Sequence, residues 1–173
     1  MPRIFDNIDL KLLPDLQQAM KDAYRADFCV GYFNLRGWKQ LDGYVEQWQG
    51  GDANSVRLLV GMQKLPQDEL KGFYRYTHNE VELDNQTASR LKRKLAEEFR
   101  TQLTIGAPTN DDELALRRLA VQLRGKKVVV KLYLRTSLHA KLYLFHTKDT
   151  RTPIVGYMGS SNLTFAGLSN QGE

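Results

Sequence analysis

The spacing of hydrophobic positions along the chain predicts helices alternating with short strands. Residues 12–24 place apolar side chains three and four positions apart, as a helix with one buried face requires, and Pro14 suits its first turn. Residues 38–48 repeat this spacing and end at Gly50 and Gly51, where a helix cap is expected. Short apolar runs rich in β-branched and aromatic residues predict strands over 26–35, 55–62, 128–134, 138–145 and 154–159.

Two longer helices are predicted in the second half of the chain. Residues 85–103 carry Leu91, Leu95 and Phe99 as an apolar stripe. A further helix is predicted to begin at Asn110 as N-cap, with Glu113 completing a capping box, and to end at residue 125, a glycine. Helices interleaved with strands indicate an α/β domain in which helices cover a sheet.

The strand predicted over 138–145 places two basic side chains in an apolar segment. Alternate side chains of a strand share a face. The even-numbered residues are expected to form the core wall: Leu138, Ala140, Leu142 and Leu144. His139 and Lys141 would then point together to the other side, where both could approach one anion.

Composition is that of one globular domain covering residues 1–173. The 42% hydrophobic content can build a core, and the single Cys29 is expected to pack as a small hydrophobe rather than form a disulfide. No apolar run approaches the roughly 20 residues of a membrane span, and the N-terminus lacks a secretory signal. We therefore expect a cytoplasmic protein that does not enter a membrane. The abrupt end at Glu173 suits the N-terminal part of a longer protein.

Basic residues cluster in the two long predicted helices and directly after the second one. The net charge is +5 and the isoelectric point about 9.3. The clusters contain Arg90, Lys92, Arg93, Lys94, Arg117, Arg118, Arg124, Lys126 and Lys127. Two interpretations stay open: a solvated helix surface partly neutralised by acidic neighbours, or a surface that follows the phosphates of a nucleic acid.

A second polar stretch follows the last predicted strand. The sequence GSSN places Ser160, Ser161 and Asn162 where a strand meets a loop, a common position for ligand sites in α/β folds. Alone, this stretch would equally suit a turn with a helix cap, and the basic pair at 139 and 141 would suit an exposed strand face.

Together, these stretches resemble the signature of the phospholipase D superfamily, H-x-K followed by G-S-x-N. The matching positions are His139, Lys141, Gly159, Ser160 and Asn162, and the tail AGLSNQGE places Glu173 where family members carry a glutamate. The resemblance implies a three-layer α/β/α sandwich with a mixed β-sheet, of the phospholipase D and nuclease type. One position departs from the pattern, because His146 stands where the family has an aspartate that helps structure, and the nearest acid is Asp149.

The resemblance also implies a reaction, which is phosphodiester cleavage through a covalent phosphohistidine. His139 would be the nucleophile, Lys141, Ser160 and Asn162 would hold the phosphate oxygens, and Glu173 would orient an imidazole. It implies neither a metal ion nor a cofactor. The reaction uses two imidazoles, whereas the family signature is matched here once, at His139 and Lys141, so a homodimer pooling two motifs is expected.

These observations favour a metal-independent nuclease acting on DNA. Lipids or other small phosphodiesters are the alternative substrates. A different function also stays open, that of a non-catalytic DNA-binding N-terminal module in a larger helicase or restriction-type protein with C-terminal helicase domains. An α/β domain of unrelated function is the third reading.

Overall fold

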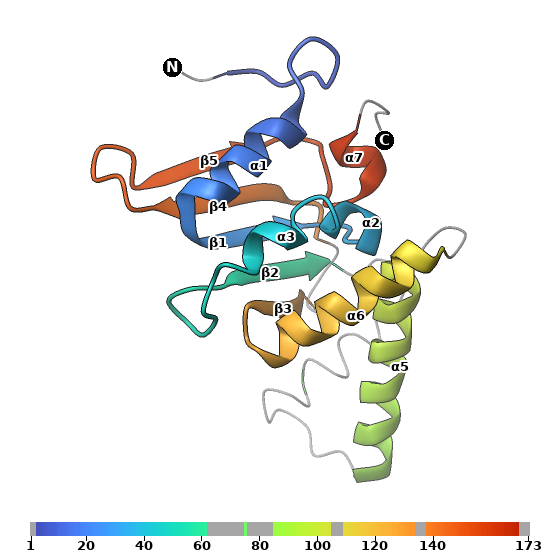
Figure 1. Ribbon diagram of the computed structural model, residues 1–173. Helices are drawn as coiled ribbons and strands as arrows, with labels where there is room; N and C mark the ends of the chain where they lie inside the picture. Colours follow the sequence, from blue (N-terminus) through green and yellow to red (C-terminus); the bar gives the residue numbers. More distant parts are fainter. Residues whose placement is uncertain (1–2, 62–74, 76–84, 105–108, 134–137, 170–173) are drawn as a thin grey trace.

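Five strands form one mixed β-sheet in the computed structural model, which describes residues 3–61, 75, 85–104, 109–133 and 138–169 (Figure 1). The strands are β1 (Ala23–Val30), β2 (Val56–Gly61), β3 (Val128–Tyr133), β4 (Lys141–Thr147) and β5 (Ile154–Met158). Their order is β3-β2-β1-β4-β5, with β1, β2 and β3 parallel and β4 antiparallel to both of its neighbours. The chain is therefore of the mixed α/β class predicted from its sequence.

Helices cover one face of this sheet. The described helices are α1 (Leu12–Asp22), α2 (Leu35–Trp38), α3 (Asp42–Val45), α5 (Asn85–Leu103), α6 (Asn110–Arg124) and α7 (Phe165–Leu168). Figure 1 shows α1, α2, α3 and α6 on the same side of the sheet, with α5 extending away below α6. Among the described residues no helix covers the opposite face, so the second helical layer of a three-layer sandwich is not seen in this part of the chain.

None of the helices in the described part of the chain combines the length and apolar character needed to cross a membrane.

The core lies between the sheet and the helices that cover it, and aromatic side chains of the central strands form part of it. Phe28 on β1 contacts Tyr143 and Phe145 on β4 edge to face, with ring centroids 5.1 and 5.3 Å apart. Leu16 and Met20 of α1 are fully buried. Edge-to-face pairs of this kind add to the free energy gained from burial alone.

The predicted assignment of faces on β4 is therefore wrong. Tyr143 and Phe145 are buried under the helices, whereas Leu142 and Leu144 are only half-buried on the uncovered face. Alternation along the strand is as predicted, but the aromatic side chains bury more apolar area than the leucines and decide which face becomes the core. Cys29 lies opposite Leu142 in the ladder and shares its half-exposed position as a free thiol.

Two helix predictions also need correction. The single helix predicted over 38–48 is wrong, because α2 and α3 are separate one-turn helices; Asn34 caps α2 by accepting a hydrogen bond from the Gly37 amide at 2.9 Å. Glycine lowers helix propensity, and this segment has one in each short helix. The capping box of α6 lies one residue earlier than predicted: Thr109 is the N-cap and Asp112 closes the box.

Candidate functional site

His139 lies over the carboxyl ends of β1 and β2, at the edge of the sheet. It precedes β4 rather than belonging to it, so the prediction that it occupies a strand is wrong, and its side chain is exposed. Its place is set by close backbone packing, because a Cβ atom at Gly31 would lie 3.0 Å from the Leu138 carbonyl oxygen and one at Gly61 only 2.6 Å from it. A side chain on Gly61 would therefore force residues 138 and 139 away from the strand ends.

Asn162 meets His139 at the same point. It is 2% exposed, and its Oδ1 accepts a hydrogen bond from the Tyr32 amide at 3.0 Å. A Cβ atom at Gly31 would lie 3.3 Å from Asn162 Oδ1 and 3.7 Å from His139 Cα, so the two residues flank one glycine. The Tyr32 amide therefore holds the carboxamide of Asn162 through its oxygen. The segments that carry His139 and Asn162, more than twenty residues apart in the sequence, thus lie side by side.

The loop that carries Asn162 is held from its other side by α7. Thr164 caps this helix, its Oγ1 accepting a hydrogen bond from the Gly167 amide at 3.0 Å. The backbones of this helix and this loop are closely packed, since a Cβ atom at Gly167 would lie 2.7 Å from the Asn162 carbonyl oxygen. The position of Asn162 therefore depends on packing on both sides of its loop.

Lys141 is the first residue of β4 and lies one strand from the GSSN loop. Its Nζ donates a hydrogen bond to the His139 carbonyl oxygen at 3.0 Å. Its own carbonyl oxygen accepts from the Gly159 amide at 3.2 Å. The side chain shares the helix-covered face with Tyr143, so Lys141 reaches the site from the end of the core rather than from an outer face.

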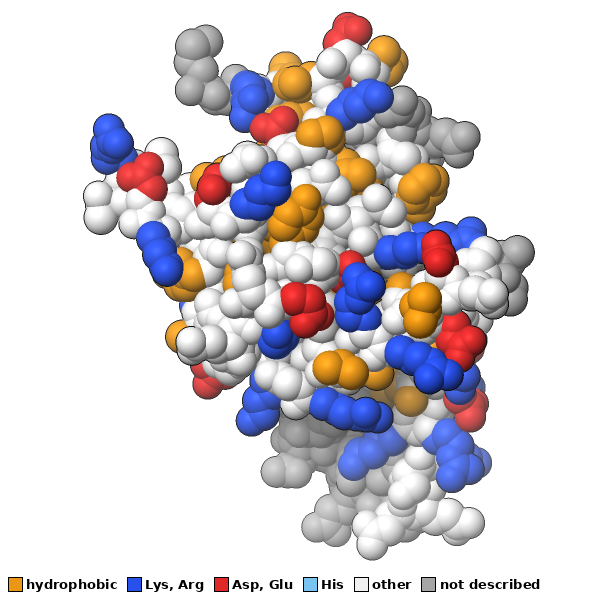
Figure 2. All heavy atoms as spheres, in the orientation of Figure 1, with side chains coloured by type: hydrophobic (Ala, Val, Ile, Leu, Met, Phe, Trp, Pro, Cys, Tyr) orange, Lys and Arg blue, Asp and Glu red, His pale blue; other side chains and the backbone are white. Residues whose placement is uncertain are grey.

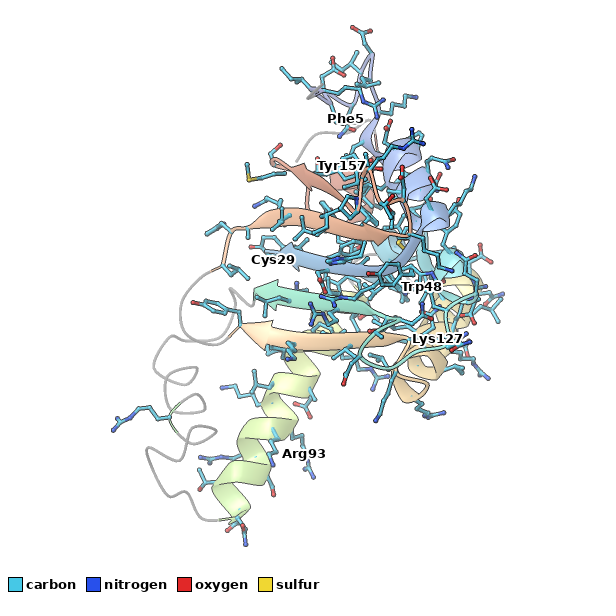
Figure 3. All side chains as sticks on the ribbon, turned by 90° about the vertical axis from the view of Figure 1, so that its left-hand side faces the viewer. Phe5, Cys29, Trp48, Arg93, Lys127 and Tyr157 are labelled. Atoms are coloured by element: carbon cyan, nitrogen blue, oxygen red, sulfur yellow. The ribbon has the colours of Figure 1, made fainter. Side chains whose placement is uncertain are left out.

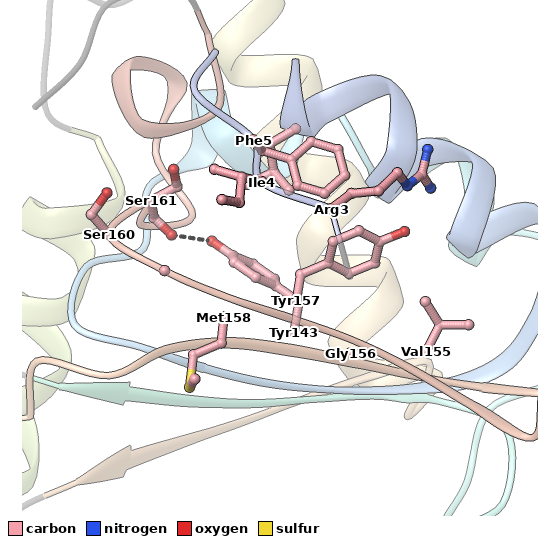
Figure 4. A pocket seen from close by; sticks show the side chains of 12 residues that line it. Arg3, Ile4, Phe5, Tyr143, Val155, Gly156, Tyr157, Met158, Ser160 and Ser161 are labelled. Carbon is pink, nitrogen blue, oxygen red and sulfur yellow. Dashed lines mark hydrogen bonds between the residues drawn. The ribbon is translucent and has the colours of Figure 1, made fainter. Parts of the chain in front are cut away.

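Ser160 stands apart from this group. Ser160 is exposed and lines a cavity of about 570 Å³ along β5, which Figure 4 shows from close by. Glu173 lies outside the described residues, so its predicted role stays a prediction. The structure thus brings together His139, Lys141 and Asn162, with Ser160 two residues from the asparagine on the neighbouring cavity wall.

His146 stands where the phospholipase D signature has an aspartate. It belongs to a charged cluster on the uncovered face of the sheet. Its Nε2 lies 2.9 Å from Asp27 Oδ2, and Arg25 and Arg57 also donate to this carboxylate. Burial alone would raise the pKa of Asp27, but the hydrogen bonds from Arg57, Arg25 and His146 outweigh it and hold the pKa well below its usual value. Through its contact with Asp27, His146 joins β4 to β1.

The basic residues of α6 are mostly neutralised by acidic partners. Figure 2 shows blue and red side chains interspersed over the helical face. Arg118 pairs with Asp42 at 3.0 Å and Arg117 with Glu113 at 2.7 Å. By contrast, Arg90, Lys92 and Arg93 on α5 are exposed, and Figure 3 shows Arg93 on the part of this helix that extends beyond the sheet. Among the described residues, these three side chains of α5 therefore offer less compensated charge than Arg117 and Arg118 of α6.

Sequence reasoning missed Gly31, Gly61 and Tyr32, which position His139 and Asn162. The signal was present, because both buried strand motifs end in valine followed by glycine, as VGY and VGM. Glycine at the carboxyl end of two adjacent strands indicates a close approach by another backbone. Within the described residues, no group of three or more His, Cys, Asp or Glu side chains is arranged to hold a metal ion.

Comparison with protein-family models and with curated proteins finds no match to this chain.

Proposed function

We propose that the chain is a phosphodiesterase of the phospholipase D type that cleaves DNA without a metal ion, using His139 as nucleophile. The observation that carries the proposal is the meeting of His139, Lys141 and Asn162 at the carboxyl edge of the sheet. These three residues carry an imidazole, an ammonium and a carboxamide, which can serve as a nucleophile and as donors for phosphate oxygens. The full three-layer fold of that superfamily and the supporting role of Glu173 form part of the same proposal.

In this mechanism the ring nitrogen of His139 attacks phosphorus, and the bond from phosphorus to the leaving oxygen breaks. Lys141 and Nδ2 of Asn162 donate to the non-bridging oxygens, on which charge accumulates in the transition state, and the Ser160 hydroxyl assists. A second imidazole protonates the leaving oxygen. Water then hydrolyses the phosphohistidine, which returns His139 to its starting state and releases a phosphate monoester.

The second imidazole would come from another copy of the chain. The sequence has three histidines; His146 is engaged by Asp27 on the uncovered face, and His78 lies in no H-x-K motif. A two-fold dimer places equivalent residues of both subunits about one axis. Because the His139 side chain is exposed at the sheet edge, it can be reached by a partner subunit.

The test measures cleavage of DNA in EDTA. Purified protein is incubated with supercoiled plasmid and with end-labelled oligonucleotides, and products are resolved by gel electrophoresis. Cleavage that survives chelation and disappears in His139→Ala is expected. Trapping of a labelled phosphoprotein by rapid acid-free denaturation would detect the intermediate, because a phosphohistidine is lost in acid.

His78→Ala is the matched control, since it removes the histidine that has no lysine two residues on. It is expected to cleave as the unaltered protein does. Equal cleavage by His139→Ala, or inhibition by EDTA, would contradict the proposal and point to a contaminating nuclease.

A second candidate is a DNA-binding module without catalysis, which could precede helicase domains in a longer protein. It is favoured by the exposed basic residues of α5, which lie on a helix that extends beyond the sheet. The module would be supported over the enzyme if both the unaltered protein and His139→Ala bound DNA in a salt-dependent way without cleaving it. This binding should be lost when Arg90, Lys92 and Arg93 are replaced by glutamine.

A further inference from the structure

The cavity along β5 opens beside the candidate site and is lined by aromatic, aliphatic, hydroxyl and basic side chains. Its volume of about 570 Å³ is in the range of small-molecule pockets. One wall is β5 and the GSSN loop, and the other is the N-terminal segment with the start of α1 (Figure 4). Because β5 is an edge strand, the cavity lies at the free border of the sheet.

Aromatic side chains and a guanidinium line this cavity. The rings of Phe5 and Tyr157 have centroids 5.7 Å apart, and the guanidinium carbon of Arg3 lies 5.6 Å from the centre of the Phe5 ring. Arg3 is also paired with Asp15 at 2.7 Å, so its charge is already compensated. The planar groups therefore offer stacking surfaces rather than a strong binding site for a free phosphate.

Two large apolar side chains at the cavity rim are almost fully in water. Ile4 is 89% exposed and Met158 is 88% exposed. A bound group that covered them would remove apolar surface from water, which is favourable. Together with the aromatic rings and the Ser160 hydroxyl, they suit a flat, partly polar ring system better than a flexible acyl chain.

The cavity lies close to the candidate phosphate site along the chain and in space. Gly159, which lines the cavity, donates its amide to the carbonyl oxygen of Lys141 at 3.2 Å. Tyr143, another lining residue, donates its hydroxyl to the Ser161 carbonyl oxygen at 2.8 Å. The cavity thus begins about one strand spacing, roughly 5 Å, from the backbone of Lys141.

We infer that this cavity receives a nucleobase of the nucleotide next to the bound phosphodiester, and that the substrate is therefore a single-stranded or unpaired nucleic acid. A base inside a duplex is stacked and paired and cannot enter such a cavity unless it is flipped out. The inference rests on the proposed function for the neighbouring phosphate. It goes beyond that proposal by selecting unpaired strands and by assigning Phe5 and Tyr157 as the stacking residues.

The test measures binding, so that it does not depend on cleavage. His139→Ala protein is titrated into fluorescein-labelled single-stranded oligonucleotides, either intact or with abasic sites in place of every base, and anisotropy is recorded. Intact strands are expected to bind about 5- to 150-fold more tightly than abasic strands, the contribution of one stacked base. Duplex of the same sequence is expected to bind more weakly than the intact single strand.

Two variants locate the effect. Phe5→Leu and Tyr157→Leu keep an apolar side chain but lose the ring, and both are expected to reduce the preference for intact over abasic strands. Phe165→Leu is the matched control, because Phe165 is an aromatic residue of α7, 49% exposed, that does not line the cavity. A melting temperature recorded for each variant confirms that it is folded.

Several outcomes would overturn the inference. Equal affinity for intact and abasic strands would show that the bases are not held. Competition by phosphatidylcholine vesicles, with no effect of the bases, would assign the cavity to lipid instead. If binding depends on the bases but the unaltered protein does not cleave DNA in EDTA, the proposed enzyme is refuted and the cavity assignment stands. If the protein cleaves DNA but binding does not depend on the bases, the cavity assignment is refuted and the proposed enzyme stands.

Discussion

At the scale of single residues, Gly61 is expected to control activity through the position of His139. Gly61→Ala would place a Cβ atom 2.6 Å from the Leu138 carbonyl oxygen, so residues 138 and 139 must move. A displacement of about 1 Å at a reacting group can lower the rate about 100-fold. We therefore expect Gly61→Ala to lose about two orders of magnitude in cleavage rate, measured with the labelled oligonucleotide.

Gly43→Ala is the control for this substitution. Gly43 lies in α3, where an added Cβ atom meets nothing within 4 Å, so the variant is expected to keep its activity and to gain about 0.5–1 kcal/mol of stability. Unchanged cleavage by Gly61→Ala would mean that His139 is not held in place by this contact.

Asp27 gives a residue-scale prediction for pH. Its pKa is lower in the folded chain than the ordinary value of 3.8, so the ionised carboxylate favours the folded state. Its contribution to the free energy of unfolding is present in full at pH values above the ordinary pKa of 3.8 and is lost as the pH falls below it. Asp27→Asn should therefore cost about 1–2 kcal/mol at pH 7, a figure reduced by partial exposure to solvent, and less at pH 3. Urea unfolding at both pH values measures the difference; an equal cost at both would contradict it.

At the scale of elements, a buried hydrogen-bond network joins α2, α3 and α6. Trp38 Nε1 donates to Gln122 Oε1 at 3.0 Å, while Gln122 Nε2 donates to the Asp42 carbonyl oxygen at 3.0 Å. Gln122→Leu would leave both partners unsatisfied in the core, so we expect a loss of about 2–3 kcal/mol in urea unfolding. Val121→Thr, at a position 61% exposed on the same helix, should change stability by less than about 0.5 kcal/mol. Equal effects of the two would argue against the network.

Elements with strong periodicity could be predicted from the sequence, and those fixed by tertiary packing could not. The bounds of α5 agree with its predicted range, because three apolar residues at helical spacing over nineteen positions leave little ambiguity. The split between α2 and α3 depends on how Trp38 and Leu41 are buried, which a local pattern does not contain. The N-cap of α6 lies one residue before the predicted one because Thr109 and Asn110 are neighbours and either side chain can accept a capping hydrogen bond.

The candidate site was predictable as a set of residues but not as an arrangement. Strand parity correctly separated Leu142 from Tyr143, yet it could not say which face helices would cover. The meeting of His139 with Asn162 depends on sheet order, since β4 lies between β1 and β5 rather than beside its neighbour in sequence, β3. Sequence spacing therefore predicted which residues to consider, whereas topology determines which of them meet.

At the scale of the whole molecule, a shared site makes activity depend on the square of the fraction of intact chains. If each site needs His139 from both subunits, a mixture of equal amounts of unaltered and His139→Ala chains, allowed to exchange subunits, contains one quarter intact dimers by random pairing. Cleavage is then expected at about a quarter of the rate of the same total amount of unaltered protein, because only intact pairs hold two imidazoles. Sedimentation equilibrium over a range of concentrations checks that a dimer forms. A rate of one half, or a monomer at concentrations where cleavage is full, would show that a single chain carries the complete site.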